Sequence, residues 1–272
     1  MIISDILIME NKNHSSKLHF YSWNVLHIIH ELNYCFDNSL ILDKYQIVQD
    51  PSNEQKRLKE IMNMINTFMK NDNTFILLQE VPYDLFQLIE KQANQKESKF
   101  GVYAYFYTRI PINRSKLADS YQNTSECLVT IYPRNLGDFS EESVIFDASK
   151  ACQIISNNRF CVINVHLPFG KNRAQALKII FQSIDEKYQK QQIIMGGDMN
   201  MTYQELKQEI NKTDLSIVKT NHYTRKWIEN NKIRTQTIDF FMTTDQVKVI
   251  SRKSLIDNDL SDHYPIYMNV YV

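Results

Sequence analysis

Polar side chains that can bind a metal ion or move a proton recur where the apolar segments of this chain end or begin. The segments, each with its polar residues, are FYSW with Asn24, FILL with Gln79 and Glu80, FCVINV with His166, IIMGG with Asp198 and Asn200, TIDFFM with Asp239, and YPIYM preceded by Asp262 and His263. A carboxylate beside a buried strand destabilises the fold unless a cation, a donor or a metal compensates its charge. No lysine or arginine adjoins these positions in the sequence. The six segments therefore predict one shared centre.

These residue types suit the attack of water on a phosphoryl group with the help of Mg²⁺. That ion prefers oxygen ligands, keeps several water molecules and needs only one or two carboxylates from the protein. In such a site the metal neutralises charge, a carboxylate aligns or deprotonates the water, and imidazoles stabilise the transition state. We therefore expect Mg²⁺ as the cofactor, with Mn²⁺ able to take its place.

The chain has only five glycines, and two of them, Gly196 and Gly197, directly precede Asp198. Glycine tolerates backbone conformations that other residues avoid, and it has no Cβ to block a close approach. We expect the pair to let the chain turn sharply at the strand end and bring Asp198 and Asn200 close to a phosphate.

Composition limits the class of protein. The 272 residues are 43% hydrophobic and 23% charged, which is ordinary for a globular protein, and 31 Lys+Arg balance 31 Asp+Glu. A polyanionic substrate would therefore have to meet a local basic patch. The four cysteines are dispersed, without metal-ligand spacing. Because no signal peptide and no apolar run of ~20 residues are found, we expect no membrane span and an intracellular protein, cytoplasmic or nuclear.

β-rich apolar runs alternate with amphipathic segments along the chain. Helical spacing of apolar residues predicts helices in the segments 50–70 and 172–190, and Thr202 with Glu205 forms a plausible capping box for a third. The strands mix continuous and alternating apolar patterns, which predicts two packed, mixed, mostly antiparallel β-sheets flanked by helices in an α/β sandwich of four layers. We expect one domain over residues 17–272, after a loosely attached leader over residues 1–16.

The order of these motifs along the chain is typical of a known superfamily. The sequence resembles the endonuclease/exonuclease/phosphatase superfamily, which has the deoxyribonuclease I-like fold. The matching motifs are WNV with Asn24, LQEV with Glu80, NVHL with His166, GDMN with Asp198 and Asn200, IDF with Asp239, and SDH with Asp262 and His263. They span residues 20–266, nearly the whole chain.

The resemblance implies a role for each of these residues. Glu80 would be the principal Mg²⁺ ligand, with Asn24 and Asp262 at or near the metal. Asp198 would orient or activate the attacking water, helped by Asn200. His166 and His263 would contact the scissile phosphate, and Asp239 would fix and charge one of those two rings.

Comparison with branches of the superfamily reduces the number of candidate substrate classes. His166 argues against the abasic-site endonucleases, which have Asn there, and RTQTIDFF replaces the PAWCDR-like stretch of inositol polyphosphate 5-phosphatases. Neutral sphingomyelinases share many motifs but carry signal peptides or membrane segments. The remaining branches act on nucleic acid, and the deadenylase/nocturnin-like and tyrosyl-DNA phosphodiesterase-like branches resemble the chain most.

Two segments could grip a nucleic acid, because aromatic faces stack on bases while cations hold the backbone. One contains Arg109 and Arg114 after a run of tyrosines, and the other contains Arg225, Lys226 and Trp227. The alternative is a tyrosine strand facing the core and a solvated basic loop. The segment HIIHE, residues 27–31, is not H-E-x-x-H, and we interpret it as loop or helix surface without a metal role.

Two functions from different classes remain. The first is a Mg²⁺-dependent phosphodiesterase that hydrolyses nucleic acid, as a 3′ exonuclease or single-strand nuclease on RNA or DNA. The alternative is a phosphatase or phospholipase-C-type hydrolase on a small or lipid phosphoester, such as an inositol phosphate or sphingomyelin. A phosphate-binding module without turnover is a third, weaker hypothesis. The sequence leaves protein partners open.

Overall fold

The computed structural model describes residues 17–107, 125–147 and 150–272. The predicted leader over residues 1–16 and the predicted substrate contacts Arg109 and Arg114 lie outside these ranges.

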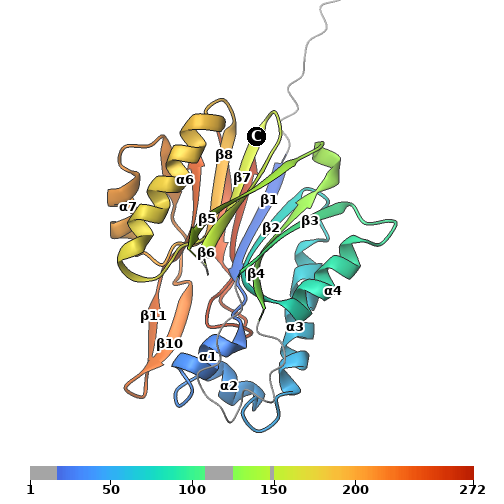
Figure 1. Cartoon of the computed structure of the whole chain (residues 1–272), viewed down its shortest axis with the longest axis vertical. Helices are drawn as coiled ribbons and strands as arrows, with labels where there is room; N and C mark the ends of the chain where they lie inside the picture. The colour runs from blue at the N-terminus through green and yellow to red at the C-terminus, as the bar shows by residue number, and fades with distance from the viewer. Residues whose placement is uncertain (1–16, 108–124, 148–149) are drawn as a thin grey trace, which may run out of the picture.

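Two six-stranded mixed sheets form the centre of the molecule (Figure 1). The first sheet has the order β13 (Lys248–Ser254), β14 (Ile266–Tyr271), β1 (Lys17–Asn24), β2 (Thr74–Pro82), β4 (Glu126–Pro133) and β3 (Phe100–Phe106). The second sheet has the order β5 (Ser140–Asp147), β6 (Lys150–Ser156), β7 (Phe160–His166), β8 (Gln192–Asp198), β12 (Asp239–Thr244) and β9 (Leu215–Val218). A separate hairpin consists of β10 (Arg225–Glu229) and β11 (Lys232–Gln236).

Helices α3 (Asn53–Phe68) and α4 (Tyr83–Ala93) cover the outer face of the first sheet, and α6 (Arg173–Lys187) and α7 (Tyr203–Ile210) cover that of the second. Helices α1 (Ile28–Tyr34) and α2 (Leu40–Tyr45) lie at one end of the sandwich (Figure 1), and short 3₁₀ turns occur at Arg134–Leu136 and Gly170–Asn172. The predicted helices correspond to α3, α6 and α7, and the capping box of Thr202 and Glu205 is present at the start of α7. None of the helices in the described residues is both long and apolar enough to cross a membrane.

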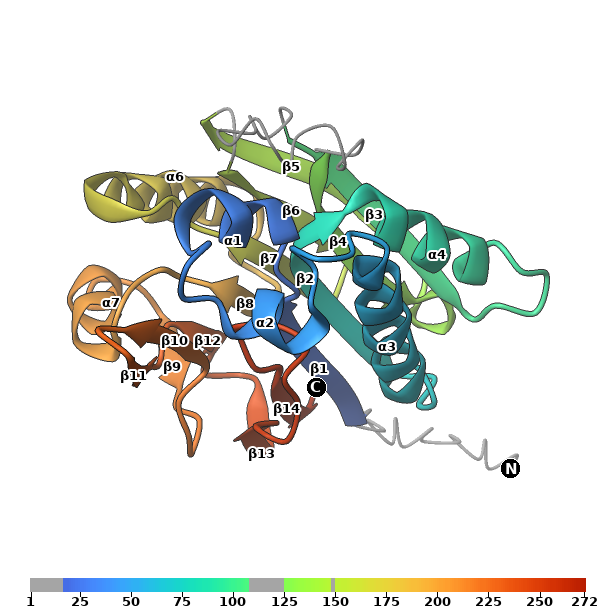
Figure 2. The same cartoon turned by 90° about the horizontal axis from the view of Figure 1, so that it is seen from below.

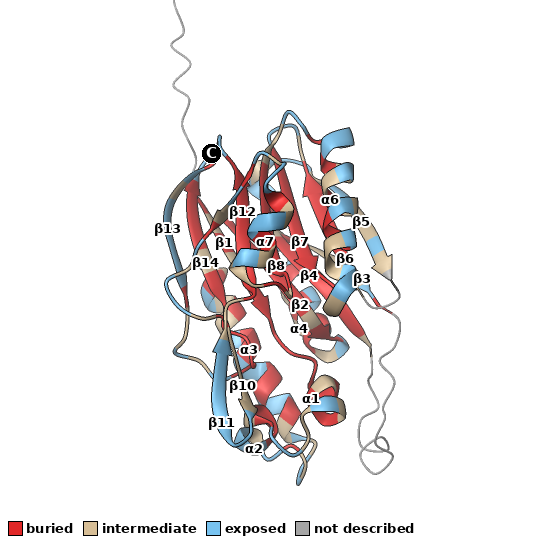
Figure 3. Ribbon diagram, turned by 90° about the vertical axis from the view of Figure 1, so that its left-hand side faces the viewer, coloured by how far each residue is buried: buried red, intermediate tan, exposed pale blue. Residues whose placement is uncertain are grey.

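Three apolar clusters hold the four layers together. One lies between the sheets and includes Phe20, Phe75 and Phe241. A second packs α3 and α4 on the first sheet, and a third packs α6 and α7 on the second sheet. Figure 3 shows that burial follows the central strands of both sheets, while β11, β13 and the outward side of α6 are exposed. This arrangement is the deoxyribonuclease I-like sandwich that the sequence predicts.

Each sheet contains one parallel pair of strands at its centre. β1 pairs with β2 in the first sheet, and β7 pairs with β8 in the second. Their register sets Asn24 opposite Gln79, and His166 opposite Asp198. Because the carboxyl ends of parallel strands meet at one edge, the predicted polar residues gather at the end of the sandwich where α1, α2 and the β10–β11 hairpin lie (Figures 1 and 2).

The explanation proposed above for the two glycines is wrong. Gly196 and Gly197 lie inside β8 and not in a turn after it. A Cβ on Gly196 would fall 2.5 Å from the ring of Phe241, and one on Gly197 would fall 1.8 Å from the backbone oxygen of Val165. The glycines therefore permit close packing between the sheets and against β7, which holds the strand that carries Asp198 in place.

Candidate active site

Asn24 joins the two sheets at the site. Its Nδ2 donates to Oε1 of Glu80 at 3.0 Å and to Oδ2 of Asp198 at 3.2 Å. Its Oδ1 accepts a hydrogen bond from the backbone N–H of Leu26 at 3.1 Å, which sets the orientation of the amide. One side chain at the end of β1 thus places a carboxylate from each sheet within reach of the same centre.

Glu80 reaches the site from an irregular point of β2. The pairing with β4 shifts between Leu78 and Val81, so that Gln79 and Glu80 form a β-bulge. Glu80 has a φ of +53°, a left-handed conformation that is uncommon for a residue other than glycine. Bulges re-aim side chains and are frequent next to active sites. Gln79 meanwhile points into the core, where its Nε2 donates to Oδ1 of Asn164 at 2.7 Å.

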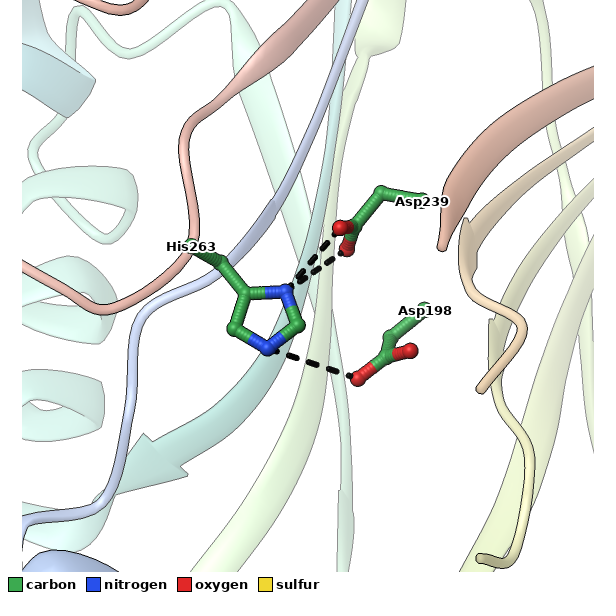
Figure 4. A group of neighbouring side chains, drawn as sticks. All are labelled: Asp198, Asp239 and His263. Atoms are coloured by element: carbon green, nitrogen blue, oxygen red, sulfur yellow. Dashed lines mark hydrogen bonds and ion pairs between the residues drawn. The ribbon is translucent and has the colours of Figure 1, made fainter. Parts of the chain in front are cut away.

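His263, from the turn before β14, lies beside two aspartates of the second sheet, Asp198 and Asp239 (Figure 4). Nδ1 of His263 lies 3.0 Å from Oδ2 of Asp239, and its Nε2 lies 3.8 Å from Oδ2 of Asp198. The three side chains offer ligand atoms within 4.8 Å of one another, so they are also a possible metal site. Thr224 braces the start of β12, because its Oγ1 accepts the backbone N–H of Asp239 at 3.1 Å.

The SDH turn is tied to β1 and to the hairpin. Ser261 donates from Oγ to the backbone oxygen of Asn24 at 2.8 Å, and Trp23 donates from Nε1 to the backbone oxygen of His263 at 3.0 Å. Oδ2 of Asp262 accepts from Nε of Arg225 at 3.0 Å. The two residues of the turn that the sequence assigned to the site are therefore buried and firmly held.

His166 and Asn200 lie beside the carboxylates of the same centre. Nε2 of His166 is 3.5 Å from Oε1 of Glu80 and 3.8 Å from Oδ2 of Asp198. Asn200 donates from Nδ2 to the backbone oxygen of Leu167 at 2.8 Å, and its own N–H donates to Oδ1 of Asp198 at 2.8 Å. As placed, Asn200 fixes the turn after β8 and so the carboxylate of Asp198.

Three further residues lie at the site that sequence reasoning did not identify: Lys150, His30 and Glu126. Nζ of Lys150 lies 2.9 Å from Nε2 of His166. Nε2 of His30 lies 2.7 Å from Oε2 of Glu126 and 3.8 Å from Oε2 of Glu80. Assigning HIIHE to the surface was therefore wrong, because His27 is buried and His30 faces the carboxylate of Glu80. The segment packs inward because α1 follows Asn24 directly.

A sequence signal for two of these residues exists. Glu126 and Lys150 are the first residues of β4 and β6. β4 is antiparallel to β2, and β6 is antiparallel to β7, so their first residues lie beside the carboxyl ends of the parallel strands. A polar residue at the start of an antiparallel neighbour thus reaches the same edge as one at the end of a parallel strand. Asp239, at the start of β12, obeys the same rule.

The two carboxylates that Asn24 joins have opposite pKa shifts. Burial opposes the ionisation of Glu80, but the cations His30 and Lys150 outweigh it and lower its pKa to about 2. Burial raises the pKa of Asp198 to about 6, and His263 offsets this only in part because Asp239 adds to it. Pairs of groups whose environments separate their pKa values often mark acid–base and electrostatic roles.

The two histidines also differ. Burial lowers the pKa of His263, but Asp239, Asp262 and Asp198 outweigh it and raise the pKa to about 10. Burial and the neighbouring Lys150 lower the pKa of His166 well below its usual value. At neutral pH His263 is therefore an imidazolium, as is His30, whose pKa, despite burial, its two carboxylate neighbours raise to about 9, whereas His166 is neutral.

The β10–β11 hairpin begins at the site itself. Arg225 forms a β-bridge with His263, and the N–H of Lys226 donates to the backbone oxygen of Asp262 at 2.9 Å. Lys226 pairs through Nζ with Asp259, and the guanidinium of Arg225 lies 5.7 Å from the ring centroid of Trp227. The predicted contacts of this segment thus border the site, although both cations already have carboxylate partners.

The tyrosine segment, residues 103–107, is less well placed than the β10–β11 hairpin to stack on nucleic-acid bases. The side chain of Tyr107 is buried, and Tyr103 contacts Ser143 on β5 through its hydroxyl at 2.7 Å. This part of the chain fits the alternative in which a tyrosine strand packs on its neighbours.

Comparison with known proteins identifies the fold. No protein-family model and no curated relative matches the chain. ANGEL2, a 2′,3′-cyclic phosphatase, in complex with adenosine-2′,3′-vanadate matches with a TM-score of 0.68 at 14% identity, covering 95% of this chain and 96% of that one. D. rerio TDP2 complexed with a single-strand DNA product matches with a TM-score of 0.65 at 15% identity, covering 95% and 100%.

A third match is an endonuclease/exonuclease/phosphatase from Bacteroides vulgatus, with a TM-score of 0.63 at 14% identity, covering 94% of this chain and 99% of that one. The chain therefore has the fold of the endonuclease/exonuclease/phosphatase superfamily, as its motifs predict.

Proposed function

We propose that this protein is a metal-dependent phosphodiesterase that hydrolyses nucleic acid, acting on single strands or 3′ ends of RNA or DNA. The observation that carries the proposal is the pair of carboxylates, Glu80 and Asp198, held by one amide and given opposite pKa shifts. One carboxylate is ionised at every physiological pH, and the other is poised to take up a proton.

The donor set fits Mg²⁺. Glu80 is ionised and largely buried, and its only ion pairs among the described residues are with histidines. Glu80 would hold the ion, with Asn24 and Asp262 beside it, although Asp262 is now engaged by Arg225. Bound there, Mg²⁺ or Mn²⁺ would neutralise charge on the phosphate and lower the pKa of a bound water.

The chain's own groups perform the proton transfer and hold the ester. Asp198, fixed by Asn24 and by the N–H of Asn200, orients the attacking water and accepts its proton. Asp239 binds Nδ1 of His263, so that Nε2–H is free to donate to a phosphate oxygen as negative charge develops. His166 borders the same space opposite Glu80.

Nucleic acid is favoured over other phosphoesters by the hairpin. β10 is bridged to the SDH turn at Arg225, so that two cations, Arg225 and Lys226, and the ring of Trp227 follow one another along a strand that borders the site and could hold a single strand. D. rerio TDP2, which shares the fold, is complexed with a single-strand DNA product. Arg109 and Arg114 remain predicted contacts.

A second candidate is a phosphatase on a small phosphoester. The match with ANGEL2, a 2′,3′-cyclic phosphatase, supports a phosphoester at a ribose end as the form to test first. Inositol phosphate and sphingomyelin, the substrates of the broader alternative, are not supported by any contact described above.

One substrate panel separates these functions. The protein is incubated with Mg²⁺ and labelled oligo(A), mixed RNA, single- and double-stranded DNA, 5′-tyrosyl DNA, RNA ending in a 2′,3′-cyclic phosphate, a phosphoinositide and sphingomyelin. We expect cleavage of at least one single-stranded nucleic acid, abolished by EDTA. A product only from the cyclic phosphate or the lipids would overturn the leading proposal.

Variants test the site in the same assay. Glu80→Gln and His263→Ala are expected to lower turnover by ~10²-fold or somewhat more without unfolding the protein. His222→Ala is the matched control and should keep wild-type activity, because His222 is exposed and the hydrogen bonds from Thr220 and Ser254 go to its backbone oxygen, which the substitution retains. Wild-type rates in both site variants would show that the site is assigned to the wrong residues.

A further inference from the structure

The two oxygens of Glu80 face different neighbours. Oε1 lies 3.0 Å from Nδ2 of Asn24 and 3.5 Å from Nε2 of His166, toward the centre of the site. Oε2 lies 3.8 Å from Nε2 of His30, and the same nitrogen lies 2.7 Å from Oε2 of Glu126. Glu126, His30 and Glu80 thus form a row that ends at the proposed metal ligand.

Glu80 needs such support because of its place in β2. It lies in the β-bulge between Leu78 and Val81 and has a φ of +53°. A residue in a bulge is not held by ladder hydrogen bonds on both sides, and a left-handed conformation persists only where its surroundings enforce it. The direction of the Glu80 carboxylate therefore depends on its side-chain contacts.

The contacts of Glu126 do not explain, by stability alone, why a carboxylate is buried at the start of β4. Only 2% of the residue is exposed, and its Oε1 is buried without a hydrogen-bond partner among the described residues. Of the ion pairs in the described part of the chain, the only one that includes Glu126 is with His30. A buried, half-satisfied carboxylate is weak evidence for stabilisation, and such a group commonly has another role.

His30 reaches the row from a different element. It lies on α1, one turn after the N-cap His27, and α1 follows Asn24 closely. Tyr34, one turn further along α1, stacks near the His30 ring with centroids 6.4 Å apart. The ring is therefore confined between Tyr34, Glu126 and Glu80, with its Nε2 turned toward both carboxylates.

We infer that Glu126 and His30 are positioning residues for Glu80: Glu126 fixes the ring of His30, and His30 holds Oε2 of Glu80 so that Oε1 faces the divalent cation. This inference rests on the proposed function in one respect, the assignment of Glu80 as the metal ligand. Partners that orient a metal ligand typically change affinity or activity ~10- to 100-fold when they are removed.

Metal binding by the metal-free protein tests the inference without any substrate. Mn²⁺ binding is measured from the loss of the free-ion EPR signal for the wild type, His30→Gln, Glu126→Gln and the double variant. Each single variant is expected to bind Mn²⁺ ~10-fold or more weakly. Because Glu126 acts through His30, the double variant should be no weaker than His30→Gln alone.

Matched controls separate positioning from general damage. His19→Gln and Glu142→Gln remove the same types of side chain far along the sheets, where His19 bonds Tyr267 and Glu142 pairs with Lys187, and should leave Mn²⁺ affinity unchanged. Thermal unfolding and near-UV circular dichroism report whether each variant is native. If Glu126→Gln does not fold, His30→Gln still decides the matter, because the His30 side chain is 26% exposed.

The outcomes distinguish this inference from the proposed function. Native variants with wild-type Mn²⁺ affinity overturn the positioning role, and so do losses that multiply in the double variant. If Glu80→Gln weakens Mn²⁺ binding while His30→Gln does not, only the positioning role fails. If Glu80→Gln binds Mn²⁺ as the wild type does, the metal assignment fails and the positioning role fails with it.

Discussion

Glu80 and Asp198 lie at corresponding places in the two halves of the molecule, yet their surroundings are opposite. Each is at the carboxyl end of the second strand of a parallel pair, and each accepts from the amide of Asn24. Glu80 faces two cationic side chains, His30 and Lys150, whereas Asp198 has another carboxylate, Asp239, beside it. Similar strand ends thus acquire different chemistry from the residues that pack against them.

The opposite pKa shifts of Glu80 and Asp198 assign them different tasks in the proposed reaction, metal binding and proton transfer. A carboxylate with a pKa of about 2 stays charged and suits a metal, and one with a pKa of about 6 can take and return a proton near neutral pH. The same division predicts that removing each carboxylate will damage a different step.

The largest effect is expected for Asp198→Asn. The amide cannot accept the proton of the attacking water, so kcat on the best nucleic acid substrate should fall by about 10³-fold. Mn²⁺ affinity should change little, because Glu80 is intact. Single-turnover kinetics and Mn²⁺ titration measure the two quantities. A loss confined to metal affinity would contradict the division.

Glu80→Gln should show the converse. It removes the charge that holds the cation, and Mn²⁺ affinity should fall by about 100-fold or more, beyond the loss expected for its partners. Part of the activity should return at high Mn²⁺, which it should not do for Asp198→Asn. Identical Mn²⁺ dependence of the two variants would remove the distinction between the two halves.

The stability of the metal-free protein should depend on pH through His263. Its pKa is raised from 6.5 to about 10, so the folded protein keeps a proton that the unfolded chain releases above pH ~6.5. The stabilisation is complete below pH 6.5 and is lost as the pH rises toward 10. His263 alone should therefore make the unfolding constant rise by up to about tenfold per pH unit between pH 7 and 9, because one proton is released on unfolding.

Asp239→Asn isolates the contribution of His263. The pKa of His30 is also raised, to about 9, so the wild-type slope contains both groups. Asp239 is the carboxylate that contributes most to keeping the proton on His263. In Asp239→Asn the unfolding free energy, measured by urea unfolding in EDTA, should therefore depend less steeply on pH. An unchanged slope would mean that Asp239 does not set the protonation of this ring.

The smallest effect is expected for Trp227→Ala, which touches neither carboxylate. Loss of one stacking contact should raise KM for a single-stranded substrate by about 10-fold and leave kcat unchanged. Tyr271→Ala is a comparison variant of similar chemistry, because it removes an exposed aromatic ring at the end of β14, where Tyr271 pairs with Lys17, the first residue of β1. A fall in kcat without a change in KM would place Trp227 in the chemical step instead.

Much of the fold and of the site could be predicted from the sequence. Apolar residues at helical spacing specify α3, and the capping box starts α7. The polar residues that end the parallel strands could be assigned to one centre, because a charge there has no local partner. Asn24, Glu80 and His263 all lie in that centre.

The tertiary structure alone decided what surrounds those residues. Glu126 and Lys150 begin strands whose antiparallel pairing brings them to the site, and α1 turns His30 inward. Sheet packing likewise explains the glycines of β8, through Phe241 and the backbone of β7. The sequence determines which types of ligand residue stand at the strand ends. The pKa values and orientations of those side chains depend instead on charges and contacts that only the pairing of distant segments creates.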